Sequence, residues 1–234
     1  MAAVLRSSRL LSRGSRTVTS VVSAAAALAA SLLTSSAKAQ ALPPERSEGW
    51  DTATTIMALS SWGLQVVMPR VFYSDPEVTV GWKARWHVSV LAPSMTLAAL
   101  SLANEQWFKE GFESPRPGCE DLPAGVGGCE SYGMFSTHSL LAFSALGQGT
   151  GVFLIDTLKW SDGQFNAGAF FGEVGVPLVL SVLTAIGRTV GDWESGGQVW
   201  ASAGVGFGAG LGTGLLYAAL QRPECGYSGG LICW

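Results

Sequence analysis

The chain has 234 residues, a length that suits a single domain. Only 13% of its residues are charged, against roughly 25% in an ordinary soluble protein, and 48% are hydrophobic. This composition excludes a disordered chain. A net charge of −3 argues against binding of nucleic acid, which requires a basic stripe. An integral membrane protein and an unusually buried helical protein remain.

The N-terminal segment has the composition of a targeting sequence. Four arginines lie between residues 6 and 16, residues 18–33 are apolar, and residues 37–39 have the small-x-small form of a signal-peptidase site. Residues 1–39 are therefore either a cleaved signal peptide or an uncleaved anchor helix, and the short, Ala-rich apolar part favours cleavage. Either alternative places the chain after residue 40 outside the cytoplasm.

Long segments almost free of charge recur through the rest of the chain. Each has about the length that a helix needs to cross ~30 Å of hydrocarbon, and nearly all charged residues lie between them. The sequence therefore predicts an all-α fold, a polytopic helical membrane bundle with about five core helices after the N-terminal signal or anchor segment. The expected helices are 52–68, 86–105, 137–158, 170–188 and 197–220, in a helical domain at 50–222 that is followed by a tail at 223–234.

Loop charge orients these helices. Arg70, Lys83 and Arg85 lie in the loop 69–85, and short basic loops of membrane proteins stay in the cytoplasm. Alternation of the helices then places residues 106–135, and the turn between the fourth and fifth helices, on the other side. We therefore expect a protein of the cell (inner) membrane with these polar loops at its extracytoplasmic face.

Glycine occupies every second position from Gly204 to Gly214. On a helix this pattern forms two rows of small residues, one at 204, 208 and 212 and the other at 206, 210 and 214. Small residues let neighbouring backbones approach closely in a bilayer. We expect both rows to be packing faces.

The four cysteines fall into two pairs. Cys119 and Cys129 lie in the loop expected outside, where oxidation is permitted, so we expect a disulfide between them. Cys225 and Cys233 belong to the tail expected inside, which argues against their pairing. The chain has no CxxC pair, and its two histidines are too far apart to form a local ligand motif. No metal site and no other cofactor is expected.

Three clusters of polar residues stand at the outer ends of the expected helices. They are Lys109 with Arg116 and Pro117; Phe135, Ser136, Thr137 and His138; and Gly187 and Arg188 followed by Asp192, Glu194 and Gln198. Arginine can hold phosphate by bidentate hydrogen bonds and lysine as a point charge. Free N–H groups at a helix start add donors, and His138 could protonate a leaving oxygen. The clusters together predict an anion pocket.

The spacing of these residues resembles that of the type 2 phosphatidic acid phosphatases, which are related to vanadium haloperoxidases. The resemblance covers about residues 50–222. The first motif, Lys-x6-Arg-Pro, is complete. The second keeps Ser136 and His138, but Phe135 and Thr137 replace the Pro and Gly of the family. The resemblance implies a phosphate site made by Lys109, Arg116, Ser136, Thr137 and Arg188, with His138 as the acid that protonates the leaving group.

The third motif departs most from the family. Gly187 stands for its Ser, Glu194 for its nucleophilic His, and Gln198 for the carboxylate that orients this His. A carboxylate at the nucleophile position would repel a phosphate dianion. Asp192 could supply a base only in a different loop register. These substitutions argue against hydrolysis of phosphate monoesters by the family's route.

Two classes of function remain open for a membrane protein with such an outward-facing phosphate pocket. It is either an active phosphoric monoester hydrolase acting on a lipid phosphate or diphosphate, or a non-catalytic phosphate-binding scaffold. The expected partners are the lipid bilayer and a phosphorylated amphipathic molecule, with no nucleic acid.

Overall fold

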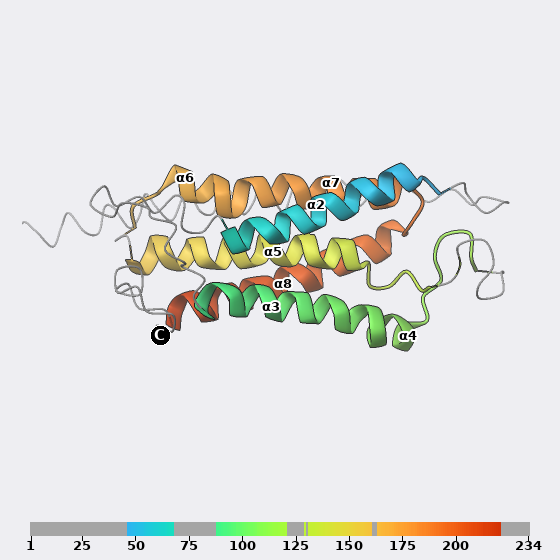
Figure 1. The fold of residues 1–234 in the computed structure, drawn as a ribbon, viewed down its shortest axis with the longest axis horizontal. Coiled ribbons are helices and arrows are strands. Elements are labelled where there is room, and N and C mark those ends of the chain that lie inside the picture. Colours follow the sequence, from blue (N-terminus) through green and yellow to red (C-terminus); the bar gives the residue numbers. More distant parts are fainter. Residues whose placement is uncertain (1–45, 68–87, 121–128, 130, 161–162, 221–234) are drawn as a thin grey trace, which may run out of the picture.

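The structure, a computed structural model, describes residues 46–67, 88–120, 129, 131–160 and 163–220. Every element in this part of the chain is helical, and five long helices run along the molecule (Figure 1). They are α2 (Glu48–Val67), α3 (Val88–Ala103), α5 (Thr137–Ile155), α7 (Val176–Val190) and α8 (Gly196–Leu220). Helix α3 is continued by η2 (Asn104–Phe108) and α4 (Lys109–Phe112), and α5 is continued by η3 (Asp156–Trp160). Helix α7 is preceded by α6 (Ala167–Phe170) and η4 (Phe171–Gly175).

These helices confirm the all-helical prediction and the five core helices. Their ends differ from the expected ends by a few residues. The predicted signal or anchor segment, the basic loop 69–85 and the tail with Cys225 and Cys233 lie outside the described residues.

Helix α5 is the centre of the bundle. It packs against α2, α3, α7 and α8, and its most extensive contact is with α8. Figure 1 shows α5 between the pair formed by α2 and α7 and the pair formed by α3 and α8. A residue at either end of α5 therefore meets side chains from several other helices.

Glycines bring α5 and α8 together. A Cβ atom added at Gly206, Gly210 or Gly214 would lie 2.4, 1.9 or 2.3 Å from a backbone oxygen of α5. The row at 206, 210 and 214 is thus a packing face, as predicted. The expectation for the second row is wrong within the described residues, because a Cβ atom at Gly204, Gly208 or Gly212 would meet nothing within 4 Å. The repeat alone cannot say which row faces a neighbouring helix.

The interior of the bundle is rich in small polar side chains. Ser61 of α2 and Ser181 of α7 both donate to the carbonyl oxygen of Ala142 on α5, at 3.4 and 2.8 Å. Gln148 of α5 donates to the hydroxyl of Ser94 on α3 at 3.1 Å. These contacts join four helices through hydrogen bonds.

The outer surface carries large apolar side chains. On α7 they follow alternating steps of three and four residues and are Val176, Val179, Leu183, Ile186 and Val190. The opposite, buried side of α7 carries Ser181, Thr184 and Arg188. A water-soluble helix buries its apolar stripe and exposes its polar one, so this arrangement is the reverse of a soluble bundle.

Within the part of the chain that the structure describes, three helical segments are long and apolar enough to cross a membrane: Thr137–Lys159, Ala167–Val190 and Gly196–Leu220. The sequence predicted five such helices. Helix α2 starts with Glu48 and Asp51 and is rich in Thr and Ser, and the apolar part of α3 ends after 16 residues at the polar Asn104 and Glu105. Length and composition therefore support a membrane protein through α5, α7 and α8.

Candidate anion pocket

The three predicted clusters meet at one end of the bundle. The start of α2, the end of α4, the start of α5, the end of α7 and the start of α8 lie there together (Figure 1). Lys109, Arg116, Ser136, Arg188, Glu194 and Gln198 are all buried. The structure thus brings the predicted residues to one site, although their partners within that site differ from the expected ones.

Arg188 and Glu194 form the buried centre of the site. Nε of Arg188 donates to Oε2 of Glu194 at 2.5 Å, and Nη2 donates to Oε1 at 2.6 Å. Both side chains are almost fully buried, at 2% and 1% exposure. Nη1 of Arg188 donates to Asp51 of α2, whose carboxylate is 39% exposed. All three nitrogens of this guanidinium group are therefore bound to carboxylates of the protein.

A tight turn after α7 carries Glu194 back to Arg188. At the end of α7, the N–H of Gly191 donates to the carbonyl of Gly187. The N–H groups of Trp193 and Glu194 both donate to the carbonyl of Arg188, at 3.1 and 3.3 Å. Asp192 has a φ of 55°, a left-handed conformation that is uncommon for residues other than glycine. Within the described chain its side chain makes no hydrogen bond or ion pair. Of the two acids in this turn, Glu194 is the one that binds Arg188.

Ser136 provides a third donor to the same carboxylate. It is the N-cap residue of α5, where its Oγ accepts from the N–H of Ser139 at 3.3 Å. Its hydroxyl donates to Oε2 of Glu194 at 2.9 Å. The N–H of Ser136 is bound to Ser202 of α8 at 2.7 Å, which fixes the start of α5 against α8. Ser136 therefore joins the helix start to the Arg188–Glu194 pair.

Gly187 leaves no space for a side chain. A Cβ atom at this position would lie 2.5 Å from Cγ2 of Thr54 and 2.8 Å from the ring of Trp50. This close approach packs α7 against α2. Glycine at this position thus has a packing reason.

Three guanidinium groups surround the indole ring of Trp193. Those of Arg46, Arg116 and Arg188 lie 5.5, 5.6 and 5.3 Å from the ring centroid, within the range of cation–π attraction. Sequence reasoning missed Trp193 and Arg46. The indole ring holds three like charges near one another at the pocket.

Arg116 is the least satisfied cation of the pocket. It is 9% exposed, and its Nε has no hydrogen-bond partner in the described part of the chain. Burial lowers the pKa of Arg116, and the charges of Arg188 and Arg46 act in the same direction, whereas Glu194 opposes them. The Nε–H of Arg116 is therefore a buried donor that the described residues leave unused.

Lys109 is bound by an acid that the sequence analysis did not include. Its Nζ lies 2.7 Å from a carboxylate oxygen of Glu105, one helical turn earlier. Glu105 also accepts from the hydroxyl of Thr137. Asn104 donates to the same hydroxyl oxygen at 2.9 Å and to the carbonyl of Phe135 at 2.8 Å. Lys109 and Thr137 thus belong to a second network beside the Arg188–Glu194 pair.

His138 contacts α2. Its Nε2 lies 2.8 Å from Oγ1 of Thr55, which also donates to the carbonyl of Asp51 at 2.9 Å. Because that carbonyl can only accept, Nε2 of His138 is the donor to Thr55 when both contacts are made. Sequence reasoning placed His138 at the pocket but gave it no partner on α2.

The side chain of Gln198 forms hydrogen bonds to two loops, the one before α8 and the one before Arg116. Its Oε1 accepts from the N–H of Ser195, and the Oγ of Ser195 accepts from the N–H of Gln198, at 2.9 and 3.3 Å. This exchange is a capping box at the start of α8. Nε2 of Gln198 also donates to Oγ of Ser114 and to the carbonyl of Pro115, at 2.9 and 2.7 Å. It therefore ties the segment before Arg116 to α8.

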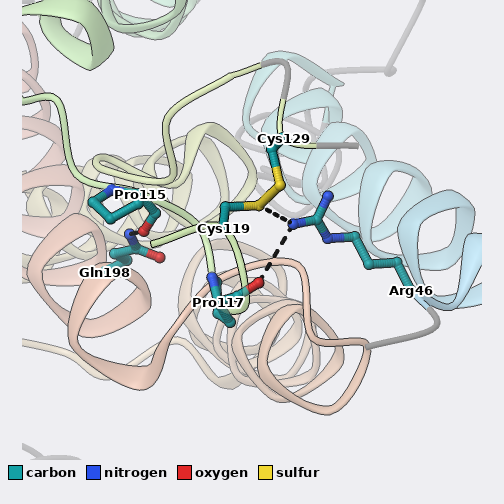
Figure 2. The surroundings of a disulfide bond; sticks show 6 residues. All are labelled: Arg46, Pro115, Pro117, Cys119, Cys129 and Gln198. Atoms are coloured by element: carbon teal, nitrogen blue, oxygen red, sulfur yellow. Dashed lines mark hydrogen bonds between the residues drawn. A yellow bond between two sulfur atoms is a disulfide. The ribbon is translucent and has the colours of Figure 1, made fainter. Parts of the chain in front are cut away.

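A disulfide closes the loop that follows Arg116. Cys119 and Cys129 are joined, as predicted from their place in the chain. Figure 2 shows Arg46 reaching this bond, with Nη2 donating to Sγ of Cys119 at 3.0 Å and to the carbonyl of Pro117 at 3.5 Å. The segment before α2 is thereby attached to the loop that carries Arg116.

No protein-family model, curated protein or solved structure matches this chain. Among the described residues no group of three or more His, Cys, Asp and Glu side chains could hold a metal ion. What the geometry offers is anion recognition by arginine and serine, with a carboxylate of the chain itself as the bound anion.

Proposed function

We propose that this chain is an integral membrane protein with the architecture of the type 2 phosphatidic acid phosphatases and with an anion pocket that does not hydrolyse phosphate esters. The proposal places the pocket at the extracytoplasmic face of the cell (inner) membrane. The three membrane-length helices and the apolar outer face support membrane insertion. The convergence of the motif residues at one end of the bundle supports the pocket.

The contacts of Glu194 are the observation that argues against hydrolysis. Glu194 stands where the family has its nucleophile, and its carboxylate accepts two hydrogen bonds from Arg188 and one from Ser136. Both donors are phosphate ligands in the family. A carboxylate held in this way repels an incoming phosphate and has its lone pairs engaged by the donors that the substrate would need.

The remaining members of the expected catalytic set also serve other contacts. Gln198 caps α8 and binds the 114–115 segment, so it does not orient a nucleophile. His138 is bound to Thr55. A proton donor alone does not replace the nucleophile, whose loss costs several orders of magnitude in turnover in other hydrolases.

A phosphate-release assay tests the proposal. The purified full chain is incubated with a panel of lipid phosphates and lipid diphosphates, with His138→Ala as the control. We expect wild type and control to release phosphate at the same background rate. A wild-type rate far above the control would overturn the proposal, and its loss in Glu194→Ala would identify Glu194 as the nucleophile of an acyl-phosphate route.

A further inference from the structure

Glu194 has the contacts of a bound ligand. Its two oxygens accept three hydrogen bonds, from Nε and Nη2 of Arg188 and from the hydroxyl of Ser136, at 2.5, 2.6 and 2.9 Å. A bidentate arginine with an added hydroxyl donor is also how proteins hold a tetrahedral oxyanion. The carboxylate therefore fills, from within the chain, a site that fits an oxyanion.

Several arginine side chains lie beside this site. Arg46, Arg116 and Arg188 surround Trp193, while the carboxylates bound to Arg188 are those of Glu194 and Asp51. Arg116 keeps a buried Nε without a hydrogen-bond partner in the described residues. Arg116 thus keeps a donor that an anion at this site can use.

Glu194 lies on a loop, whereas the groups that bind it lie on helices. It lies on a turn of five residues between the end of α7 at Val190 and the start of α8 at Gly196. The two backbone hydrogen bonds that hold residues 193 and 194 to Arg188 are 3.1 and 3.3 Å long. Arg188 and Ser136, by contrast, belong to α7 and to the cap of α5.

We infer that Glu194 is a tethered anion that keeps an oxyanion site closed, and that inorganic phosphate or the phosphate group of a ligand enters only when this carboxylate leaves Arg188. The inference rests on the proposed function, since it takes the site to bind phosphate without hydrolysing it. Arg116 supplies the additional donor to the entering ion. Affinity for phosphate is thus set by competition with Glu194.

The test compares phosphate and orthovanadate binding to the purified full chain by calorimetry. Glu194→Gln keeps the size of the side chain and removes its charge. We expect it to bind both ions about tenfold more tightly or better than wild type, which is the scale of a hydrogen bond to a charged group. Adding Arg116→Gln to Glu194→Gln should abolish most of this gain.

Asp51→Asn is the matched control. It removes a carboxylate from the same Arg188 on the 39% exposed side, away from Ser136. We expect a gain of less than about threefold, since an exposed pair contributes little. Equal gains in Asp51→Asn and Glu194→Gln would overturn the inference, because net charge alone would then explain them. A folded Glu194→Gln protein with wild-type affinity would overturn it as well.

A second variant covers the case in which Glu194→Gln does not fold. Glu194→Asp keeps the charge but is one methylene shorter, so it cannot reach both Arg188 and Ser136, and it should bind phosphate more tightly than wild type. Unchanged affinity in this variant would reject the tethered-anion inference. Phosphate release by wild type would refute the proposed function alone, because these affinities are measured with inorganic ions.

Discussion

Replacing Gly210 by alanine should destabilise the bundle, because the added methyl group would clash with the backbone of α5. The added Cβ atom would lie 1.9 Å from the carbonyl oxygen of Ser144 and 2.9 Å from the backbone nitrogen of Gln148. A carbon and a carbonyl oxygen in favourable contact are ~3.3–3.6 Å apart. Helices α5 and α8 must therefore separate by about 1.5 Å at this point, and both contact atoms belong to backbone that cannot turn aside.

The expected magnitude follows from two opposing effects. Overpacking of a tight interface costs about 1–3 kcal/mol, while alanine gains up to ~1 kcal/mol over glycine in helix propensity. Because the contact involves backbone on both sides, we take the upper part of the first range. The free energy of unfolding of Gly210→Ala should then fall by about 1–2 kcal/mol.

Gly208→Ala is the control on the same helix. A Cβ atom at Gly208 meets nothing within 4 Å, so this variant has the propensity gain without the clash. Thermal unfolding of both variants in detergent micelles, followed by helical circular dichroism, measures the difference. Equal midpoints for the two variants would refute the assignment of the 206, 210 and 214 row to the α5 contact.

Three further predictions concern the pocket and its loop. Peptide mapping with blocked thiols should recover Cys119 and Cys129 as one linked pair, and free thiols at both positions would count against an extracytoplasmic loop. Gln198→Ala should lower the free energy of unfolding by about 1–3 kcal/mol, since its amide makes two hydrogen bonds to the loop worth ~0.5–1.5 kcal/mol each, and an unchanged unfolding midpoint would contradict this role. Glu194→His combined with Gln198→Asp should hydrolyse a phosphate monoester faster than wild type and should still need His138; a folded double variant with no gain would reject the alignment of the third motif.

The helices could be predicted from the sequence because charge marks their ends. Uncharged windows located all five, and alternation of direction placed the starts of α5 and α8 and the end of α7 on one side. Of the five predicted spans, three are shown by length and composition within the described residues, those of α5, α7 and α8. A window without charge still contains Thr, Ser and Asn, which reduce its apolar character.

The pairing within the pocket was predictable only in part. Glu105 and Lys109 are four residues apart on one helix, a spacing that favours an ion pair, and this signal was available from the sequence. The contact of Asp51 with Arg188 joins residues 137 positions apart. Nothing local indicates such a contact, because it depends on how α2 packs against α7. The same holds for Arg46 and Trp193.

The hydrogen bonds of Ser61 and Ser181 to one carbonyl of α5 have a consequence for how this sequence can change over time. Helices in lipid gain little from apolar burial and depend on close approach and on weak polar contacts, each worth ~0.6 kcal/mol on average. Loss of one hydroxyl at such a site is a small event, but any larger side chain moves a whole helix. The interior should therefore accept exchange among Gly, Ala and Ser wherever no backbone lies in the way, and the outer face of α7 should drift freely among Val, Leu and Ile. This pattern of substitution is the opposite of that in a soluble core, where large apolar residues are the ones retained.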